Sequence, residues 1–231
     1  MQCFYYILMK MNKYFELLQN IVNNGKTQHN KKGDNRYLLN QVLSLNKNEI
    51  NELFNEYKVA KKKLTSELEL YLKGETQVSK YNNAGIKWWD YIGDEFINSY
   101  PNYYKKLPGL IKKINKENRP SKNYVFINGD TNVKSTQQPC VSLIHFQVPN
   151  NELHITAYQR SADSNLGLPS DIYQAMLLSK KINAPLKNIT FFIGNAHIYE
   201  NNIEETKKML KGKDYKFILN TEKIKGGIYT K

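Results

Sequence analysis

The chain has 231 residues and a formal net charge of +13 at neutral pH, with a pI near 9.4. This length is most simply one domain with a substantial core, and the two cysteines, Cys3 and Cys140, exclude a disulfide framework and a cysteine-rich zinc site. The charge favours anionic partners, although the abundance of Lys, Asn, Ile and Tyr is explained equally well by a biased genome composition.

The basic residues do not form the pattern that nucleic-acid binding requires. Such binding needs a basic stripe with interleaved aromatic side chains, and only residues 100–106 and 112–122 approach it. Residues 1–9 are apolar, but they are too short to span a bilayer and carry no recognisable cleavage site. We therefore expect a protein of the reducing cytoplasm with no membrane partner and no direct nucleic-acid partner. Residues 1–11 are expected to form a tail that need not belong to the fold.

Helical periodicity dominates the first half of the chain. Apolar residues at helical spacing predict helices over about 13–22, over 48–73, after Thr76 and over 103–116. A polar loop is predicted after the first helix, as far as Gly33. Gly74 is expected to end the long second helix, because glycine adopts the left-handed conformation that closes many helices.

Beyond Asn123 the period changes to that of strands. Short apolar or alternating runs predict strands over about 124–127, 141–148, 153–160, 188–194 and 215–219. Pro149-Asn150-Asn151 is expected to join two of them as a hairpin turn, and helices are predicted over about 170–182 and 202–210. This mixture predicts a single α/β or α+β domain over residues 12–231, and periodicity alone leaves its topology open.

Three motifs in the second half carry the chemistry. They are Gln138-Pro139-Cys140-Val141, Gln159-Arg160-Ser161-Ala162-Asp163 and Leu166-Gly167-Leu168-Pro169-Ser170-Asp171-Ile172. A lone cysteine before a strand is ordinarily a small buried hydrophobe. This ordered set, however, resembles the active-site core of the thymidylate synthase family, and the resemblance covers most of residues 12–220.

The resemblance implies a fold, a substrate and a cofactor. The expected fold is one α/β domain with a large mixed sheet flanked by helices. Two copies would pair through their sheets as a homodimer in which each site borrows residues from both subunits. The expected substrate is a pyrimidine nucleoside monophosphate and the co-substrate is 5,10-methylenetetrahydrofolate, with no metal.

The same resemblance assigns the reacting groups. Pyrimidine C5 becomes nucleophilic only after a thiolate adds to C6, and such a thiolate needs positive charge beside it. By resemblance Cys140 is this nucleophile, and Arg160 lies close to it while holding the substrate phosphate. Ser161 gives a hydroxyl to the same phosphate, and Asp163 contacts the folate. Taken alone, Arg160 and Asp163 would be only an ion pair or a turn cap.

Two lysines extend the expected phosphate site. Lys31 stands where the family's N-terminal phosphate loop has arginine, and Ser121-Lys122-Asn123 resembles the Ser-Arg-Arg element that reaches the partner subunit's site. Lysine lacks the bidentate fork of arginine, so weaker phosphate binding is expected. The alternative is that Lys31 and Lys122 are ordinary solvated lysines.

Asp171 is expected to read the base. It stands where the uracil-reading members carry Asn, and deoxycytidylate hydroxymethylases resemble this chain in carrying a carboxyl there. Cytosine accepts at N3 and donates from its amine, which a carboxyl holding one proton matches. A mismatch leaves buried polar groups unpaired, at about 1–3 kcal/mol each. The alternative, compatible with base reading, is that Asp171 caps the following helix.

Further residues follow from the resemblance. His197 and Tyr199, in Gly194-Asn195-Ala196-His197-Ile198-Tyr199, alternate onto one strand face and would bind the sugar 3′-hydroxyl. Glu67 aligns with the glutamate that relays protons through water. Trp89 and Asp90 resemble the pair that flanks the folate, and Tyr100 resembles a tyrosine near the nucleophile.

The expected reaction is transfer of a one-carbon unit to C5 of dCMP, with hydroxymethyl-dCMP as product, as phages use for their DNA precursors. Water capture is favoured over reduction, because residues 223–231 are too short and too rich in Gly and Lys to supply a closing tail. Thymidylate synthesis, dCMP methylation and a nucleotide-binding paralogue without turnover remain as alternatives.

Overall fold

The computed structural model describes residues 12–30, 33–57, 59–133, 135 and 137–211. Four sequence expectations lie outside these residues: the tail over residues 1–11, the phosphate lysine Lys31, the strand over 215–219 and the interpretation of residues 223–231.

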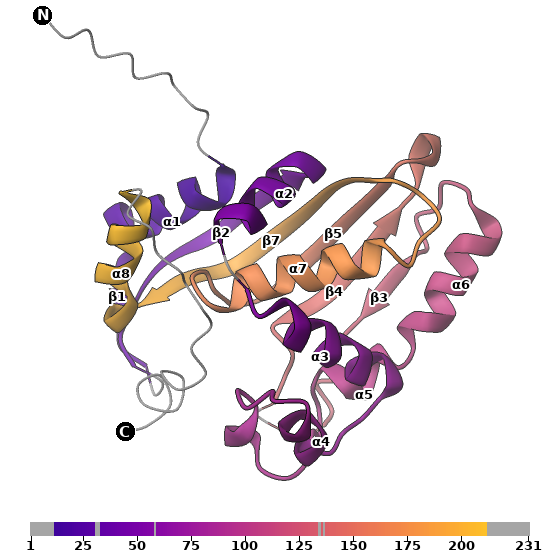
Figure 1. The fold of residues 1–231 in the computed structure, drawn as a ribbon, viewed down its shortest axis with the longest axis horizontal. Helices are drawn as coiled ribbons and strands as arrows, with labels where there is room; N and C mark the ends of the chain where they lie inside the picture. Colours follow the sequence, from indigo (N-terminus) through magenta and orange to yellow (C-terminus); the bar gives the residue numbers. More distant parts are fainter. Residues whose placement is uncertain (1–11, 31–32, 58, 134, 136, 212–231) are drawn as a thin grey trace, which may run out of the picture.

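A seven-stranded mixed sheet forms the centre of the fold (Figure 1). Its order is β1-β2-β7-β5-β4-β3, and β6 pairs with β7 beside this path. Neighbours are antiparallel except for β5 and β6, which run parallel to β7. The strands are β1 (Lys26–Gln28), β2 (Asn35–Asn46), β3 (Val125–Ile127), β4 (Val141–Gln147), β5 (Leu153–Gln159), β6 (Ala162–Asp163) and β7 (Leu186–Tyr199).

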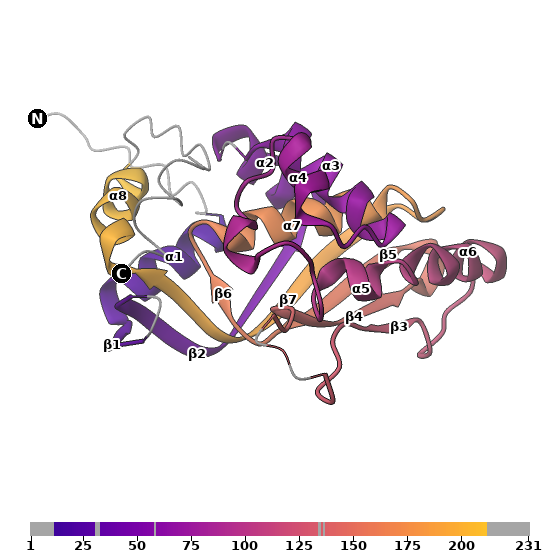
Figure 2. The ribbon, with the colours of Figure 1, turned by 90° about the horizontal axis from the view of Figure 1, so that it is seen from below.

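The described helices cover one side of the sheet, and none covers the other (Figure 2). Alternate residues of the central strands, such as Phe146, Ile155 and Phe191, are buried beneath the helices. The mixed sheet with flanking helices confirms the predicted fold class. The helices are α1 (Lys13–Asn24), α2 (Lys47–Glu56), α3 (Lys61–Lys73), α4 (Val78–Asn83), α5 (Tyr100–Tyr104), α6 (Leu107–Glu117), α7 (Gly167–Ser179) and α8 (Glu200–Leu210).

The prediction of one long helix over 48–73 is wrong. Helix α2 ends at Glu56, the following Tyr57 has an extended backbone, and α3 then begins at Lys61. The Tyr57 side chain is buried and donates its hydroxyl to the carbonyl oxygen of Asn165. Tyr57 is thus a tertiary anchor at the break between two helices. At the other end, Gly74 closes α3 in the left-handed conformation, as predicted.

Strand β2 was not predicted, although it is twelve residues long. It runs antiparallel to β7 over nearly its whole length, and Leu43 and Leu45 alternate into the core. The strand is irregular near its middle, at Asn40, where φ is +53°. Leu43 and Leu45 are its only buried apolar residues, so the period-2 signal in the sequence is short.

Four segments meet between the sheet and the helices that cover it. Cys140 immediately precedes β4, Gln159 ends the neighbouring β5, Asp171 lies in α7 and Glu67 lies in α3. Helix α7 lies across the middle of the helix-covered face (Figure 1), and Asp171 on this helix accepts a hydrogen bond from Gln159 at the end of β5. This crossing positions the candidate site.

Candidate active site

A cavity of about 480 Å³ lies between α3, residues 88–92, the start of β4, the end of β5 and α7. Eight of the residues predicted from the sequence line it. They are Glu67, Trp89, Tyr100, Cys140, Arg160, Ser161, Asp163 and Asp171. The cavity thus brings together a thiol, a guanidinium and three carboxyl groups.

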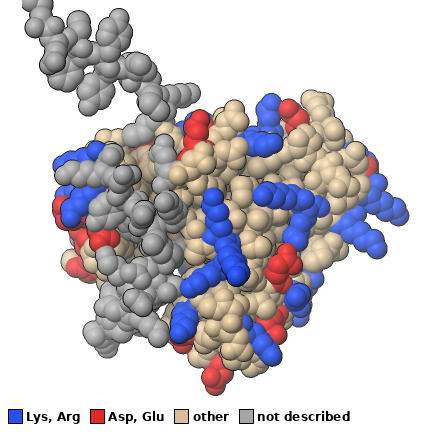
Figure 3. All heavy atoms as spheres, viewed as in Figure 1, with Lys and Arg blue, Asp and Glu red and all other residues tan. Residues whose placement is uncertain are grey.

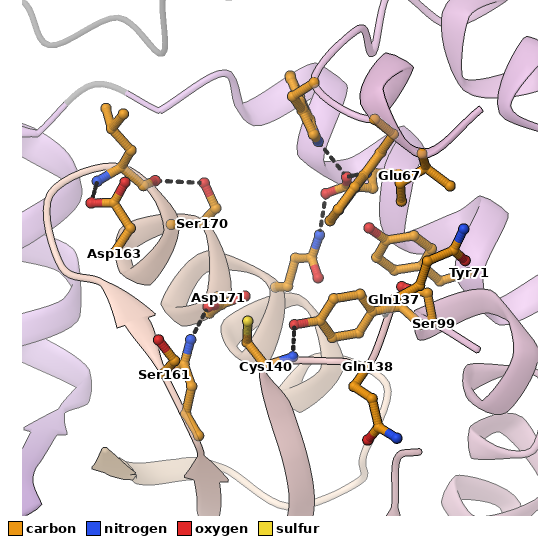
Figure 4. Close-up of a pocket in the computed structure, with 18 of the residues that line it drawn as sticks. Glu67, Tyr71, Ser99, Gln137, Gln138, Cys140, Ser161, Asp163, Ser170 and Asp171 are labelled. Carbon is orange, nitrogen blue, oxygen red and sulfur yellow. Dashed lines mark hydrogen bonds between the residues drawn. The ribbon is translucent and has the colours of Figure 1, made fainter. Parts of the chain in front are cut away.

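Cys140 is half-buried in the cavity wall, and its sulfur points toward Asp171 (Figure 4). The backbone N–H groups of Cys140 and Val141 both donate to the hydroxyl oxygen of Tyr100, at 3.2 and 3.3 Å. Tyr100 is buried and stacks on Tyr71 with ring centroids 5.3 Å apart. A packed phenol therefore fixes the backbone that carries the thiol.

Arg160 ties the segment before Cys140 to the end of β5. Its Nη2 donates to the carbonyl oxygen of Gln138 at 2.8 Å, and its Nε donates to that of Pro139 at 3.2 Å. The residue is exposed although it lines the cavity, so the guanidinium stands at the cavity mouth. Ser161 lines the cavity beside it. A guanidinium and a hydroxyl at an accessible rim provide donors for a phosphate group.

Asp171 is held in the interior by Gln159. The Gln159 Nε2 donates to Asp171 Oδ2 at 2.6 Å, an interaction drawn as a dashed line in Figure 4. Burial raises the pKa of Asp171 to about 7; the nearby Glu67 adds to this rise, while the hydrogen bond from Gln159 opposes it. Asp171 lies inside α7, which begins at Gly167, so the alternative that it caps this helix is wrong.

Glu67 is buried and accepts hydrogen bonds from three side chains. The indole N–H groups of Trp88 and Trp89 donate to Oε1 at 2.6 and 2.5 Å, and the Gln174 amide donates to Oε2 at 2.6 Å. Burial raises the pKa of Glu67, and these hydrogen bonds counteract part of the rise. Trp88 and Gln174 were missed from the sequence. Of these two residues, only Trp88 lies next to a predicted site residue, Trp89.

Asp163 is the third carboxyl in the cavity. Its Oδ1 accepts from the backbone N–H groups of Asn165 and Leu166, both at 3.2 Å. Burial raises the pKa of Asp163, and the neighbouring His197 lowers it. Asp163 and His197 are direct partners in the register of β6 and β7.

His197 and Tyr199 are not among the residues that line the cavity. Both are buried on β7, and their rings meet edge to face with centroids 5.2 Å apart. The Nδ1 of His197 is 3.1 Å from Asn195 Oδ1. The alternation that places them together is as predicted, while a contact with a sugar stays a prediction.

Two further predicted residues lie away from the cavity lining. Asp90 is exposed at the start of a 3₁₀ turn over Asp90–Ile92, and Lys122 is exposed before β3. On the face shown in Figure 3, Lys and Arg side chains are scattered in small groups and form no continuous stripe. Among the described residues there is no cluster of three His, Cys, Asp or Glu suited to a metal ion. Within the same part of the chain, no helix is long and apolar enough to cross a bilayer.

Comparison of the sequence with known proteins assigns the chain to a family. A thymidylate synthase from Buchnera aphidicola subsp. Baizongia pistaciae is 28% identical over 180 residues, which cover 68% of each chain. A thymidylate synthase from Ascaris suum is 28% identical over 243 aligned positions, covering 86% of this chain and 81% of the relative. The sequence profile described as thymidylate synthase matches residues 12–225, and the chain therefore belongs to the thymidylate synthase family.

Proposed function

We propose that this protein transfers a one-carbon unit from methylenetetrahydrofolate to C5 of dCMP and releases 5-hydroxymethyl-dCMP. The observation that carries the proposal is that Cys140 and Asp171 line one cavity, with the Cys140 sulfur pointing toward the carboxyl (Figure 4). A thiol that adds to C6 and a group that reads the 3,4-edge must reach the same ring, and this arrangement meets that requirement.

Asp171 supports cytosine as the base. A pKa of about 7 lets this carboxyl keep its proton near neutral pH, so one oxygen donates and the other accepts. The donor matches N3 of cytosine and the acceptor matches the exocyclic amine. With the proton on that oxygen, uracil would place its N3–H against a donor and its O4 against an acceptor.

Arg160 and Ser161 would bind the nucleotide phosphate. Arg160 is accessible at the rim, and its guanidinium donates to the two residues before Cys140. Binding of a phosphate by Arg160 would therefore be coupled to the orientation of the thiol. Lys31 and Lys122 are proposed to contribute positive charge to phosphate binding, Lys122 in the site of a second subunit.

The cavity residues also fit a folate. The thymidylate synthase family uses methylenetetrahydrofolate as its one-carbon donor. Trp89 lines the cavity together with Tyr91 and Ile92, giving an apolar and aromatic wall suited to a flat pterin ring. The carboxyl of Asp163 would accept from the N–H groups of the pterin, and Asp90 would lie at its outer edge.

Glu67 supports water as the group that completes the reaction. A buried carboxyl with a raised pKa beside the reacting ring is suited to accept a proton from water and return it. The indole and amide donors hold both Glu67 oxygens in fixed positions. Attack by water at the transferred carbon would give the hydroxymethyl product.

We further propose that two copies pair through the open face of the sheet. Register places Ile127, Leu143, Tyr158, Phe192 and Val42 in one row across five strands. Four of them are among the most exposed large apolar side chains of the described residues. No Asp, Glu, Lys or Arg occurs in β3, β4 or β5. A row of exposed apolar side chains on uncharged strands, in a chain of net charge +13, is a composition expected of a buried interface.

Release of tritium from C5 tests the function directly. The purified protein, methylenetetrahydrofolate and C5-labelled dCMP should release tritium faster than with labelled dUMP, and the product mass should show a hydroxymethyl group. A preference for dUMP with a methylated product would instead establish thymidylate synthesis, the activity named for the curated relatives. Binding without release from either nucleotide would favour a paralogue without turnover.

A further inference from the structure

We infer that Gln159 is a second specificity-determining residue, whose side-chain oxygen accepts one N–H of the amino group on the substrate base. The inference rests on the proposed function, because it concerns how the same cavity recognises an aminopyrimidine. Gln159 ends β5, lines the cavity and is only 1% exposed. Glutamine side chains are mostly exposed to solvent, so a glutamine buried in the cavity wall calls for hydrogen-bond partners other than solvent.

The amide of Gln159 is satisfied at one end only. Nε2 donates to Asp171 Oδ2 at 2.6 Å, whereas Oε1 is buried and accepts from no described group. A buried amide oxygen without a donor is unfavourable, and native structures keep few such groups. Because Gln159 forms part of the cavity wall, a bound ligand is the natural source of the missing donor.

The contact with Asp171 also fixes the orientation of the amide. A carboxyl oxygen that accepts from Nε2 requires Nε2 to face Asp171, so Oε1 is the end left for a ligand. The same contact favours the proton of a neutral Asp171 on Oδ1, since Oδ2 already accepts. Gln159 therefore sets which Asp171 oxygen donates and which accepts.

A 4-amino group completes this pattern and a 4-oxo group does not. The amine carries two N–H groups, one for Asp171 Oδ2 and one for Gln159 Oε1, while Asp171 Oδ1 donates to N3. A 4-oxo base would bring an acceptor against both oxygens and leave its own O4 and Gln159 Oε1 buried without a hydrogen. Gln159 would thus strengthen discrimination that Asp171 alone would provide in part.

Equilibrium binding of three nucleotides tests this arrangement, with Trp88 and Trp89 fluorescence in the cavity or calorimetry as the readout. The wild-type protein should bind dCMP about tenfold or more tighter than both dUMP and N4-methyl-dCMP, which lacks one of the two N–H groups. Gln159→Ala should lower both ratios by about tenfold, because it removes the second acceptor and makes room for the methyl group. Gln159→Met keeps the side-chain length and should lower the dCMP-to-dUMP ratio in the same way.

Gln138→Ala is the matched control. Gln138 lines the same cavity, but its amide donates away from Asp171, to the carbonyl oxygen of Asp130 at 3.3 Å. This variant should leave both binding ratios unchanged. Equal binding of dCMP and N4-methyl-dCMP by the wild-type protein would overturn the inference without any variant.

The outcomes separate the inference from the proposed function. If the wild-type protein prefers dCMP but both Gln159 variants keep its ratios, the assignment of Gln159 is wrong and the function stands. If the wild-type protein binds dUMP more tightly than dCMP, the proposed function fails and the inference fails with it.

Discussion

The backbone N–H of Arg160 donates to the carbonyl oxygen of Cys140 at 2.9 Å. The candidate nucleophile and the candidate phosphate-binding residue are therefore joined directly, at the ends of the adjacent strands β4 and β5. Side-chain donation from Arg160 to Gln138 and Pro139 adds two more links to the same segment. A phosphate that pulls on the guanidinium would also adjust the backbone that holds the thiol, which couples binding to reactivity.

Cys140→Ser should abolish turnover while leaving the nucleotide bound. A hydroxyl is a far weaker nucleophile than a thiolate, so tritium release should fall by about three orders of magnitude or more. Calorimetry with dCMP should give an affinity close to that of the wild-type protein, because Arg160, Ser161 and Asp171 are unchanged. Retained release in the variant would show that another group attacks the ring.

Asp171→Asn should move the base preference toward uracil. The amide can turn its oxygen toward N3–H and its nitrogen toward O4, a match with uracil that the protonated carboxyl does not offer. With two hydrogen bonds at stake, the ratio of dCMP to dUMP affinities should change by about 100-fold. Nucleotide titrations of both proteins at one pH measure this ratio, and an unchanged ratio would remove Asp171 from base recognition.

The same substitution should change how stability depends on pH. Burial raises the pKa of Asp171 from 3.8 to about 7, so between these values the folded protein holds a proton that the unfolded chain has released. The stability that this proton contributes is fully present below pH 3.8 and is lost as pH rises toward 7, at up to about 1.4 kcal/mol per unit.

Thermal unfolding between pH 4.5 and 7.5 measures this contribution. Asp171→Asn should show a less negative slope of Tm against pH than the wild-type protein, because its amide does not titrate. Glu52→Gln, which changes an exposed carboxyl on α2, should keep the wild-type slope. Parallel slopes for wild type and Asp171→Asn would contradict a titration of Asp171 near neutral pH.

Short motifs predicted the site better than periodicity predicted the elements around it. Cys140, Arg160 and Asp171 occur in contiguous runs, and the structure brings all three to one cavity. By contrast, Trp88 and Gln174 entered the site through tertiary contacts with Glu67, and such contacts leave no trace in local spacing.

The errors in the fold have the same origin. The residues around Tyr57 carry a helical pattern, yet a buried hydrogen bond from its hydroxyl to Asn165 coincides with a break in the helix. The long strand β2 pairs with β7, which is over 140 residues away in sequence at every partner. Local propensity carries no information about such pairing, so tertiary context decides these segments.

Glu67→Leu should destabilise the protein through the donors that it leaves behind. Two indole N–H groups and the Gln174 amide would lose their acceptor, at a total cost of about 2–4 kcal/mol. Urea unfolding gives this free energy, and the tryptophan emission should shift because both indoles change partners. Glu69→Leu, on the same helix, removes a surface ion pair with Lys181 at 2.9 Å and should cost less than about 1 kcal/mol. Equal losses in the two variants would contradict a buried role for Glu67.

If two copies pair through the sheet as proposed, Phe192→Lys should separate the dimer into monomers. Phe192 is 45% exposed near the centre of the apolar row, between Tyr158 and Val42, and a lysine there would place a charge of the same sign on both facing sheets. Burying an unpaired ammonium group in such an interface costs several kcal/mol, enough to abolish pairing at micromolar concentration. Sedimentation velocity of the wild-type and variant proteins measures the change.

The control for this variant is a lysine placed on an exposed apolar residue outside the sheet. Ile97 is 60% exposed in the segment before α5, and Ile97→Lys should leave the dimer intact. If Phe192→Lys stays folded and dimeric, the open sheet face is not the interface. If it becomes monomeric and also loses turnover while Ile97→Lys keeps it, each active site needs the second subunit. That result would support a contribution of Lys122 across the interface, because this exposed residue lies outside the cavity of its own chain.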